Sequence, residues 1–301
     1  MIRFPTGLAL SALLVATAAL AGCGGGGSGS SASKADYTIA AQSTSENLVL
    51  AYIYQDALRT AGYQASVVPE DGDNTMVIPA LAANTANLTI DYLGALLTYL
   101  RPTAPARTAA GIEKALPPLL ASKGLAMGTA SPAADAPAIA VTAATAATDH
   151  LTMLADLKPY ASKWTFGGSV ACDVQPTCLP GLQSLYGVTF QSFRVTDSFG
   201  PVTDSTLLNG QVEAAEVMSA EPDVALDHFK VLADPKGLEP VGNLVPVMRT
   251  AVATKAALSV INKVSAAITQ TDLVQLNMQV SAQRLDPLNV ASKFVTGHHL
   301  G

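Results

Sequence analysis

The pattern of hydrophobic and polar positions near the start of the chain predicts short strands that alternate with helices. Residues 37–41, 63–68 and 88–90 are short apolar runs of the kind that form buried strands. Residues 43–47, Ser-Thr-Ser-Glu-Asn, are good N-cap residues, and Gly62 is typical of a helix end. Between them, apolar residues recur at helical spacing: Leu50, Ile53, Tyr54, Ala57, Leu58 and Ala61. The pattern predicts a strand–helix–strand unit.

The same alternation continues towards the C-terminus. Extended segments are expected at 125–130, 138–142, 164–166, 193–196, 212–218, 230–233 and from Val245. Helices are expected over 76–83, 93–100, 107–122, 180–186, 203–208, 222–228, 254–267, 271–280 and 287–295, the third of these interrupted near Pro117-Pro118. Strands that alternate with helices indicate α/β layers with largely parallel sheets.

One internal similarity refines this picture. Residues 138–141 are a short apolar strand that runs into a helix near Ala144, and residues 245–248 run in the same way into a helix from Thr254. Each strand follows a stretch that contains Pro or Gly. Two such entry points, about a hundred residues apart, suggest two lobes that each begin at one of these strands.

The N-terminal segment has the pattern of an export signal. Arg3 precedes an apolar run over 8–20 that is too short to span a bilayer comfortably. The run ends in Leu20-Ala21-Gly22-Cys23, which resembles the bacterial lipobox, so we expect cleavage after residue 22 and acylation of Cys23. The alternative is an ordinary signal peptide with an incidental cysteine. Residues 23–36 are then a Gly/Ser tether.

Composition narrows the classes of function. The chain has 301 residues, of which 49% are hydrophobic and 13% charged, with a formal net charge of -6 and no basic run. Nucleic acid is therefore excluded as a partner, because phosphate binding needs clustered Lys and Arg. The sequence has no catalytic or phosphate-binding motif and no His cluster with metal-ligand spacing, so we expect a binding protein without cofactor or metal.

Five blocks of the sequence carry a more specific signal. They are "TSENLVLAYIYQDALRTAGYQ" (44–64), "LTIDYLGALLTYL" (88–100), "FGGSVACDVQPTCLPGLQSLYGV" (166–188), "LNGQVEAAEVMSAEPDVALDHFKVLADPKG" (208–237) and "GNLVPVMR" (242–249). In this order, the blocks resemble the substrate-binding proteins of glycine betaine/choline/carnitine ABC importers, the ProX/OpuC/OsmF group. The similarity covers almost all of residues 37–298.

The resemblance implies a type II periplasmic-binding-protein fold, in which two α/β lobes enclose a ligand cleft. Lobe 1 is expected over 37–138 and 243–301, and lobe 2 over 139–242. The implied function is that of a monomeric solute-binding lipoprotein, held on the extracytoplasmic face of the cell membrane. It binds a small osmolyte-like compound and delivers it to an ABC permease.

The resemblance also implies site residues, and several depart from the family pattern. Tyr92 matches a tyrosine of the aromatic cage that holds a quaternary ammonium. Met218 stands where another ring is usual, no ring occurs in 136–139, and Gly242 replaces the ring before the asparagine that matches Asn243. Gln175 stands where the family has the arginine that binds the ligand carboxylate, and Ala171 replaces a glutamate.

These departures suggest a ligand that is less cationic, less anionic, or both. A neutral polar solute fits the hydrogen-bonding groups of Gln175, Ser43, Thr44 and Asn243, and Phe199 is a candidate for a missing ring. Ser43 and Thr44 also fit a plain helix cap. We interpret Asp91 as a structural acceptor. Glu221 fits either a counter-charge for a cation or the cap of the helix that begins at Pro222.

Cys172 and Cys178 enclose Gln175, and in an exported protein they predict a disulfide that orders this loop. Zinc is disfavoured because no His lies nearby in the sequence. Two other hypotheses remain open. One is an orphan receptor or scaffold lipoprotein on the same fold that serves a sensor. The other is a degenerate wall-associated lipoprotein without a small-molecule ligand.

Overall fold

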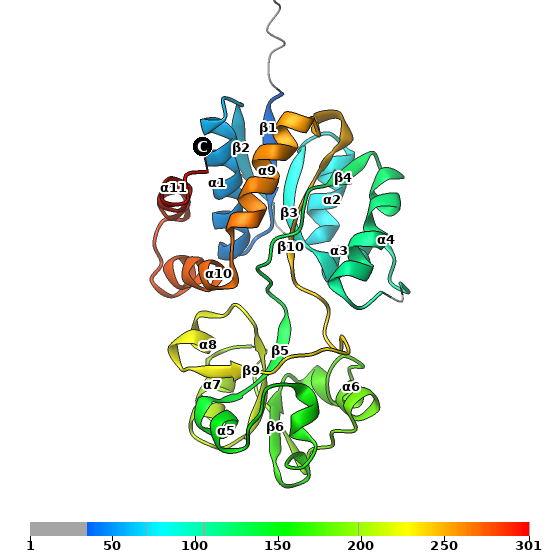
Figure 1. Ribbon diagram of the computed structural model, residues 1–301, viewed down its shortest axis with the longest axis vertical. Coiled ribbons are helices and arrows are strands. Elements are labelled where there is room, and N and C mark those ends of the chain that lie inside the picture. Colours follow the sequence, from blue (N-terminus) through cyan, green and yellow to red (C-terminus); the bar gives the residue numbers. More distant parts are fainter. Residues whose placement is uncertain (1–34, 71, 105, 198, 301) are drawn as a thin grey trace, which may run out of the picture. The chain divides into compact units, whose positions relative to one another are not determined.

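Two five-stranded sheets organise the part of the chain that the computed structural model describes, residues 35–70, 72–104, 106–197 and 199–300 (Figure 1). The expected signal peptide 1–22, the acylation site Cys23 and nearly all of the tether 23–36 lie outside the described residues. Within the described ranges, no helix combines the length and hydropathy that a membrane span requires.

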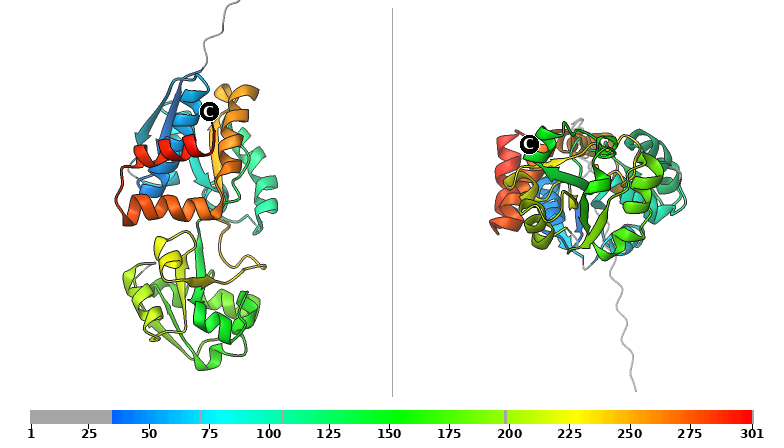
Figure 2. Two further views of the ribbon diagram at one scale, coloured as in Figure 1. Left: turned by 60° about the vertical axis from the view of Figure 1, so that its left-hand side comes forward. Right: turned by 90° about the horizontal axis from the view of Figure 1, so that it is seen from below.

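The first sheet has the strand order β2-β1-β3-β10-β4. Its strands are β1 (Tyr37–Ala41), β2 (Ala65–Pro69), β3 (Leu88–Tyr92), β4 (Leu125–Met127) and β10 (Leu244–Arg249). The α-helices described for this lobe are α1 (Ser45–Thr60), α2 (Asn74–Ala82), α3 (Leu93–Leu100), α4 (Ala109–Ala121), α9 (Lys255–Ala267), α10 (Gln270–Asn277) and α11 (Pro287–Gly297). Figure 2 shows α11 running beside α1, with which it is in contact.

The second sheet has the strand order β7-β6-β8-β5-β9. Its strands are β5 (Pro137–Thr142), β6 (Thr165–Gly168), β7 (Ser192–Val195), β8 (Ala214–Met218) and β9 (Phe229–Val231). The helices are short: α5 (Ala143–Thr148), α6 (Leu179–Gly181), α7 (Pro201–Leu208) and α8 (Pro222–Leu226). Residues 137–231 thus build a second lobe, and the chain then returns to the first.

The sheets are mixed, whereas the sequence pattern predicted largely parallel ones. Strand β10 is antiparallel to β3 and β4, and β5 is antiparallel to β8 and β9; the other pairings are parallel. The reason is that β5 and β10 each enter their sheet from the other lobe, so neither follows a right-handed crossover helix within one sheet. These are the two strands that the sequence singled out as entry points.

Both faces of each sheet are covered by aliphatic side chains. Helix α1 packs Leu50, Ile53 and Leu58 on one face of the first sheet, and α2, α3 and α4 cover the other. Helix α4 runs without a break through Pro117 and Pro118, so the interruption predicted there is wrong. Its buried residues Ile112, Leu116 and Leu120 recur every four residues, and this packing holds the helix together across the prolines.

Two antiparallel segments connect the lobes, and they lie very close together. The backbone N–H of Asp135 donates to the carbonyl of Gly242 at 2.9 Å, and Ala134 forms a β-bridge with Asn243. A Cβ at position 242 would overlap the carbonyl oxygen of Asp135, so this crossing requires glycine. The second segment is also anchored to α3, whose first N–H groups, from Leu93 and Gly94, donate to carbonyls of the crossing.

Candidate functional site: a cleft lined by carboxylates

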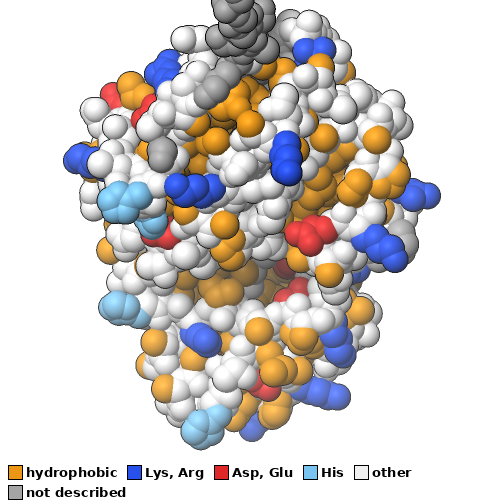
Figure 3. Space-filling model, turned by 45° about the horizontal axis from the view of Figure 1, so that its top comes forward, with side chains coloured by type: hydrophobic (Ala, Val, Ile, Leu, Met, Phe, Trp, Pro, Cys, Tyr) orange, Lys and Arg blue, Asp and Glu red, His pale blue; other side chains and the backbone are white. Residues whose placement is uncertain are grey.

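A large cavity in the described part of the chain lies where the two connecting segments meet the edges of both lobes. It has a volume of ≈ 720 Å³ and is lined by the start of α1, by Asp73 and the start of α2, by Tyr92 and α3, and by the crossings 135–137 and 240–242. From the second lobe come Met218, Glu221 and Pro222, and from the C-terminal helices Asn277 and Ser281. Figure 3 shows the molecule hollowed here, with hydrophobic and acidic side chains inside.

Tyr92 occupies the centre of a hydrogen-bond network on the first lobe. It is the last residue of β3, and its hydroxyl donates to Oε1 of Glu46 and accepts from Nδ2 of Asn47 at 3.0 Å. Asn47 also donates to Oγ1 of Thr44, the N-cap of α1, at 3.2 Å. Burial, followed by the charge of Glu46, raises the pKa of the Tyr92 phenol well above its usual value. Tyr92 therefore stays neutral and acts as a donor to Glu46.

Glu46 is the acidic centre of this network. Its side chain is 7% exposed, in the first turn of α1. Burial and then the nearby charge of Asp135 raise the pKa of Glu46 to about 7, and Glu221 adds to the rise. A carboxylate with this pKa is easily protonated while the cleft is empty, and a cation beside it would hold it in the charged form.

Asn277, the last residue of α10, links Glu46 to the second lobe. Its Nδ2 donates to Oε2 of Glu46 and, at 3.0 Å, to the carbonyl of Ala220. Its Oδ1 is buried and has no hydrogen-bond partner among the described residues. Such an acceptor is costly unless something donates to it, and a ligand ammonium group in the cleft is a suitable donor.

Two more carboxylates approach Glu46 from the crossing and from lobe 2. Oδ1 of Asp135 accepts from the backbone N–H of Ala220 at 2.8 Å, which ties the first crossing to the end of β8. Burial raises the pKa of Asp135, and burial together with the charge of Asp135 raises the pKa of Glu221. Glu221 is the N-cap residue of α8, but its side chain makes no capping hydrogen bond to the helix.

The other end of the cleft holds Asp91 and Asp73. Asp91 is fully buried, and its Oδ1 accepts from the backbone N–H of Tyr92 at 2.7 Å. Burial raises the pKa of Asp91 to about 7. Asn74 offsets part of this rise, although no described donor meets Oδ2 in hydrogen-bonding geometry. Asp73 caps α2 by accepting from Thr75 at 2.9 Å, and its charge acts on Asp91.

The charge of the lining is one-sided. Five carboxylates line the cleft, and among the described lining residues there is no Lys, Arg or His; the five are Glu46, Asp73, Asp91, Asp135 and Glu221. The apolar part of the wall comes from Tyr92, Tyr99, Met218 and three prolines. This arrangement can hold a cation next to aromatic faces, and it offers no counter-charge to an anion.

The structure brings three of the residues predicted as ligand-binding into the cleft lining: Thr44, Tyr92 and Met218. It places the other four elsewhere. Ser43 is exposed, and Nδ2 of Asn243 donates to the carbonyl of Ser131 at 3.0 Å, which fastens the crossing. Phe199 has a φ of 59° in the turn before α7 and does not line the cleft.

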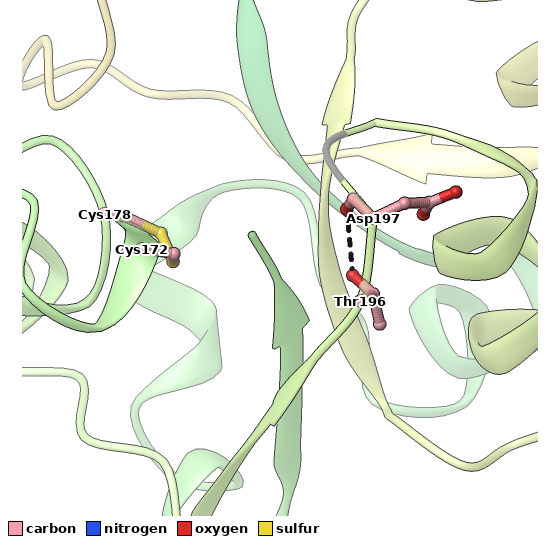
Figure 4. The surroundings of a disulfide bond; sticks show 4 residues. All are labelled: Cys172, Cys178, Thr196 and Asp197. Atoms are coloured by element: carbon pink, nitrogen blue, oxygen red, sulfur yellow. Dashed lines mark hydrogen bonds between the residues drawn. A yellow bond between two sulfur atoms is a disulfide. The ribbon is translucent and has the colours of Figure 1, made fainter. Parts of the chain in front are cut away.

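Gln175 is exposed, outside the lining, and its loop explains why. A disulfide joins Cys172 to Cys178, both fully buried, and closes residues 172–178 onto the second lobe (Figure 4). The flanking Val170 and Val174 are 73% and 76% exposed, so the loop presents its side chains to solvent. Within the described ranges, the grouping closest to a metal site is Cys172, Cys178 and Glu216, and the disulfide occupies both sulfurs.

Several lining residues escaped the sequence analysis. Glu46 was counted only among the N-cap residues 43–47, Asp135 lies between predicted elements, and Asn277 comes from a helix far along the chain. Tyr99 could have been found, because it lies seven residues after Tyr92, two turns further along α3 on the same side.

Two α/β lobes that flank a cleft are the architecture of solute-binding receptors, among other classes of protein. The chain belongs to the OpuAC family, the substrate-binding domain of the ABC-type glycine betaine transport system, whose model matches residues 35–297. It therefore has the two-lobed type II periplasmic-binding-protein fold, and it is a solute-binding receptor of an ABC transport system rather than an enzyme.

Solved structures agree with this fold. A glycine betaine/carnitine/choline ABC transporter protein is similar with a TM-score of 0.81 and 24% identity over 88% of this chain and 99% of the other. Apo YehZ from Escherichia coli is similar with a TM-score of 0.79 and 21% sequence identity, over 88% of this chain and 99% of the other. Lactococcal OpuAC, in its closed conformation with glycine betaine, is similar with a TM-score of 0.55 and 13% sequence identity, over 88% of this chain and 96% of the other. A search of curated proteins by sequence finds no match.

Proposed function

We propose that this chain is the extracytoplasmic solute-binding lipoprotein of an ABC importer, and that its ligand is a small organic cation without a carboxylate. The observation that carries this proposal is the cleft lining, which holds five carboxylates and, in the described part of the chain, no basic residue. A zwitterion such as glycine betaine would bring its own carboxylate among these acids without a partner for it. A choline-like cation avoids that cost.

The rings of Tyr92 and Tyr99 support the same ligand class, since an organic cation within reach of an aromatic face gains on the order of 0.5–2 kcal/mol. Closure of the two lobes about the crossing segments would bury the ligand and present the closed form to the permease. Among the ligands considered from the sequence, the carboxylates favour a cation over a neutral polar solute.

A thermal-shift screen tests the ligand class. Choline, glycine betaine, carnitine, ectoine and a polyol are each added to the purified chain at neutral pH. A ligand at a hundred times its dissociation constant adds about 2.7 kcal/mol of apparent stability. We expect choline to raise the melting temperature more than betaine or the polyol does. A shift with the polyol or betaine alone would contradict the proposal.

The lipoprotein part of the proposal rests on the lipobox-like Leu20-Ala21-Gly22-Cys23. We expect Cys23→Ala to release the protein from the membrane fraction of cells that express it, because the acyl chains provide the anchor. Immunoblots of washed membranes and soluble fractions measure this. Retention of the variant in the membrane pellet after a detergent-free wash would show that Cys23 is not the anchor.

A further inference from the structure

The carboxylates of the cleft fall into two groups at opposite ends of Tyr92. At the backbone end, the N–H of Tyr92 donates to Oδ1 of Asp91 at 2.7 Å. At the far end of the side chain, the Tyr92 hydroxyl donates to Oε1 of Glu46. The two acids are therefore separated by the length of a tyrosine side chain, along a wall of the same cavity.

The first group, called here the Asp91 group, consists of Asp91 and Asp73. Asp91 is fully buried, and its Oδ2 meets no donor in hydrogen-bonding geometry among the described residues. Asp73, at the N-cap of α2, lies close enough for its charge to act on Asp91. Gln42 and Asn74 complete this end of the lining, joined by a hydrogen bond of 3.0 Å, and neither carries charge.

The second group, called here the Glu46 group, consists of Glu46, Asp135 and Glu221, which come from lobe 1, the crossing and lobe 2. Asn277 stands over Glu46 and is 5% exposed. Its Oδ1 has no partner within the described residues, although its Nδ2 makes two hydrogen bonds. This end of the cleft therefore combines three carboxylates with a buried neutral acceptor, Oδ1 of Asn277, that lacks a hydrogen-bond donor among the described residues.

We propose that the ligand is a dication: two ammonium groups joined by a flexible spacer about as long as a tyrosine side chain, one for the Asp91 group and one for the Glu46 group. This inference rests on the proposed function and specifies its substrate class. A single ammonium can neutralise one group and leaves the other without a counter-charge in a confined cleft. A linear diamine satisfies both, and its apolar spacer lies beside Tyr92.

Isothermal titration calorimetry with the full mature chain tests this. The probes are the diamine putrescine, the monoamine butylamine of the same carbon chain, and choline. The variants are Glu46→Gln and Asp91→Asn, each removing a carboxylate with little change of shape. Glu113→Gln and Asp173→Asn are matched controls, because both residues are exposed and lie outside the cleft lining.

We expect putrescine to bind the wild type at least tenfold more tightly than butylamine. Each cleft variant should lower the affinity for putrescine to about that for butylamine. The two control variants should bind putrescine within twofold of the wild-type affinity. Butylamine should respond to one cleft variant and not the other. The comparison of putrescine with butylamine on the wild type holds even if a variant fails to fold.

Three results would overturn the inference. If choline binds and putrescine binds no more tightly than butylamine, the dication is wrong while the proposed cation receptor stands. If only one of the two cleft variants weakens putrescine, a single group holds the ligand and the two-group arrangement is wrong. Absence of binding by every cation tested would overturn this inference and the proposed function together.

Discussion

Glu46 shows how one residue can set the chemistry of the cleft. It is an acid in the first turn of α1, a position that the helix dipole favours. Burial nevertheless raises its pKa to about 7, because the Tyr92 hydroxyl and the Asn277 amide do not fully replace the lost water. The empty receptor therefore keeps an acid that is easily protonated at neutral pH, and a cation would restore its charge.

A prediction at this scale concerns stability and pH. The folded protein binds a proton at Glu46 more tightly than the unfolded chain does, so protonation of Glu46 stabilises the fold. This contribution to the unfolding free energy is complete below pH 4.5 and is lost as the pH rises through about 7. Glu46→Gln should therefore flatten the fall in unfolding free energy between pH 5 and 8 by on the order of 1–3 kcal/mol. Urea unfolding of the ligand-free protein at both pH values measures it.

The exposed Glu113→Gln provides the control for that experiment, and it should follow the wild-type pH dependence. The pKa of Asp91 is also raised, so part of the pH dependence of the unfolding free energy will remain in the Glu46→Gln variant. An undiminished slope in Glu46→Gln would mean that Glu46 is already ionised in the empty cleft.

Among the elements, the two connecting segments approach each other closely, and the second is bonded to the start of α3. The N–H groups of Leu93 and Gly94 at the start of α3 donate to the second segment, at 2.9 and 2.7 Å. They are therefore occupied and do not offer an anion site at this helix start. Gly94 and Gly242 both allow backbones to approach where a Cβ would collide. Position 242, where the resemblance suggests a ring, therefore has no room for a side chain in this structure.

Gly242→Ala should therefore destabilise the protein by about 1–3 kcal/mol, because the crossing must shift to avoid the Asp135 carbonyl. Thermal unfolding by circular dichroism measures the loss. Gly297→Ala is the matched control: its Cβ would meet nothing within 4 Å, and it lies in α11. If the Gly242→Ala protein is as stable as the control, the connecting segments can accommodate a Cβ at position 242 and the predicted collision with Asp135 is wrong.

Most elements could be predicted from the sequence, because hydrophobic periodicity and N-cap residues are local signals. The strands ending at Ala41, Thr142 and Met218 and the helices α1, α3 and α9 lie where the pattern placed them. The antiparallel direction of β5 and β10 could not be predicted, because it depends on which lobe the chain comes from.

For the whole molecule, the two lobes and their cleft follow from the family, and the composition of the site does not. Tyr92 and Met218 line the cleft, but the acids around them come from separate segments. These acids are Glu46 in α1, Asp73 before α2, Asp91 in β3, Asp135 in the first crossing and Glu221 before α8. Proximity between such distant segments is a property of the fold that no local pattern records. Gln175 shows the complementary case. Its place in the sequence fitted the resemblance, whereas the structure places it on an exposed, disulfide-closed loop outside the cleft lining, and its role in ligand binding stays a prediction.

We propose that the charge of the cleft selects a cation and rejects a carboxylate. The most direct test is calorimetric titration of the mature protein with choline and with glycine betaine, in one buffer at pH 7.5 and low ionic strength. We expect choline to bind at least about tenfold more tightly than glycine betaine, a difference of about 1.4 kcal/mol or more. Glycine betaine binding as tightly as choline, or more tightly, would contradict it.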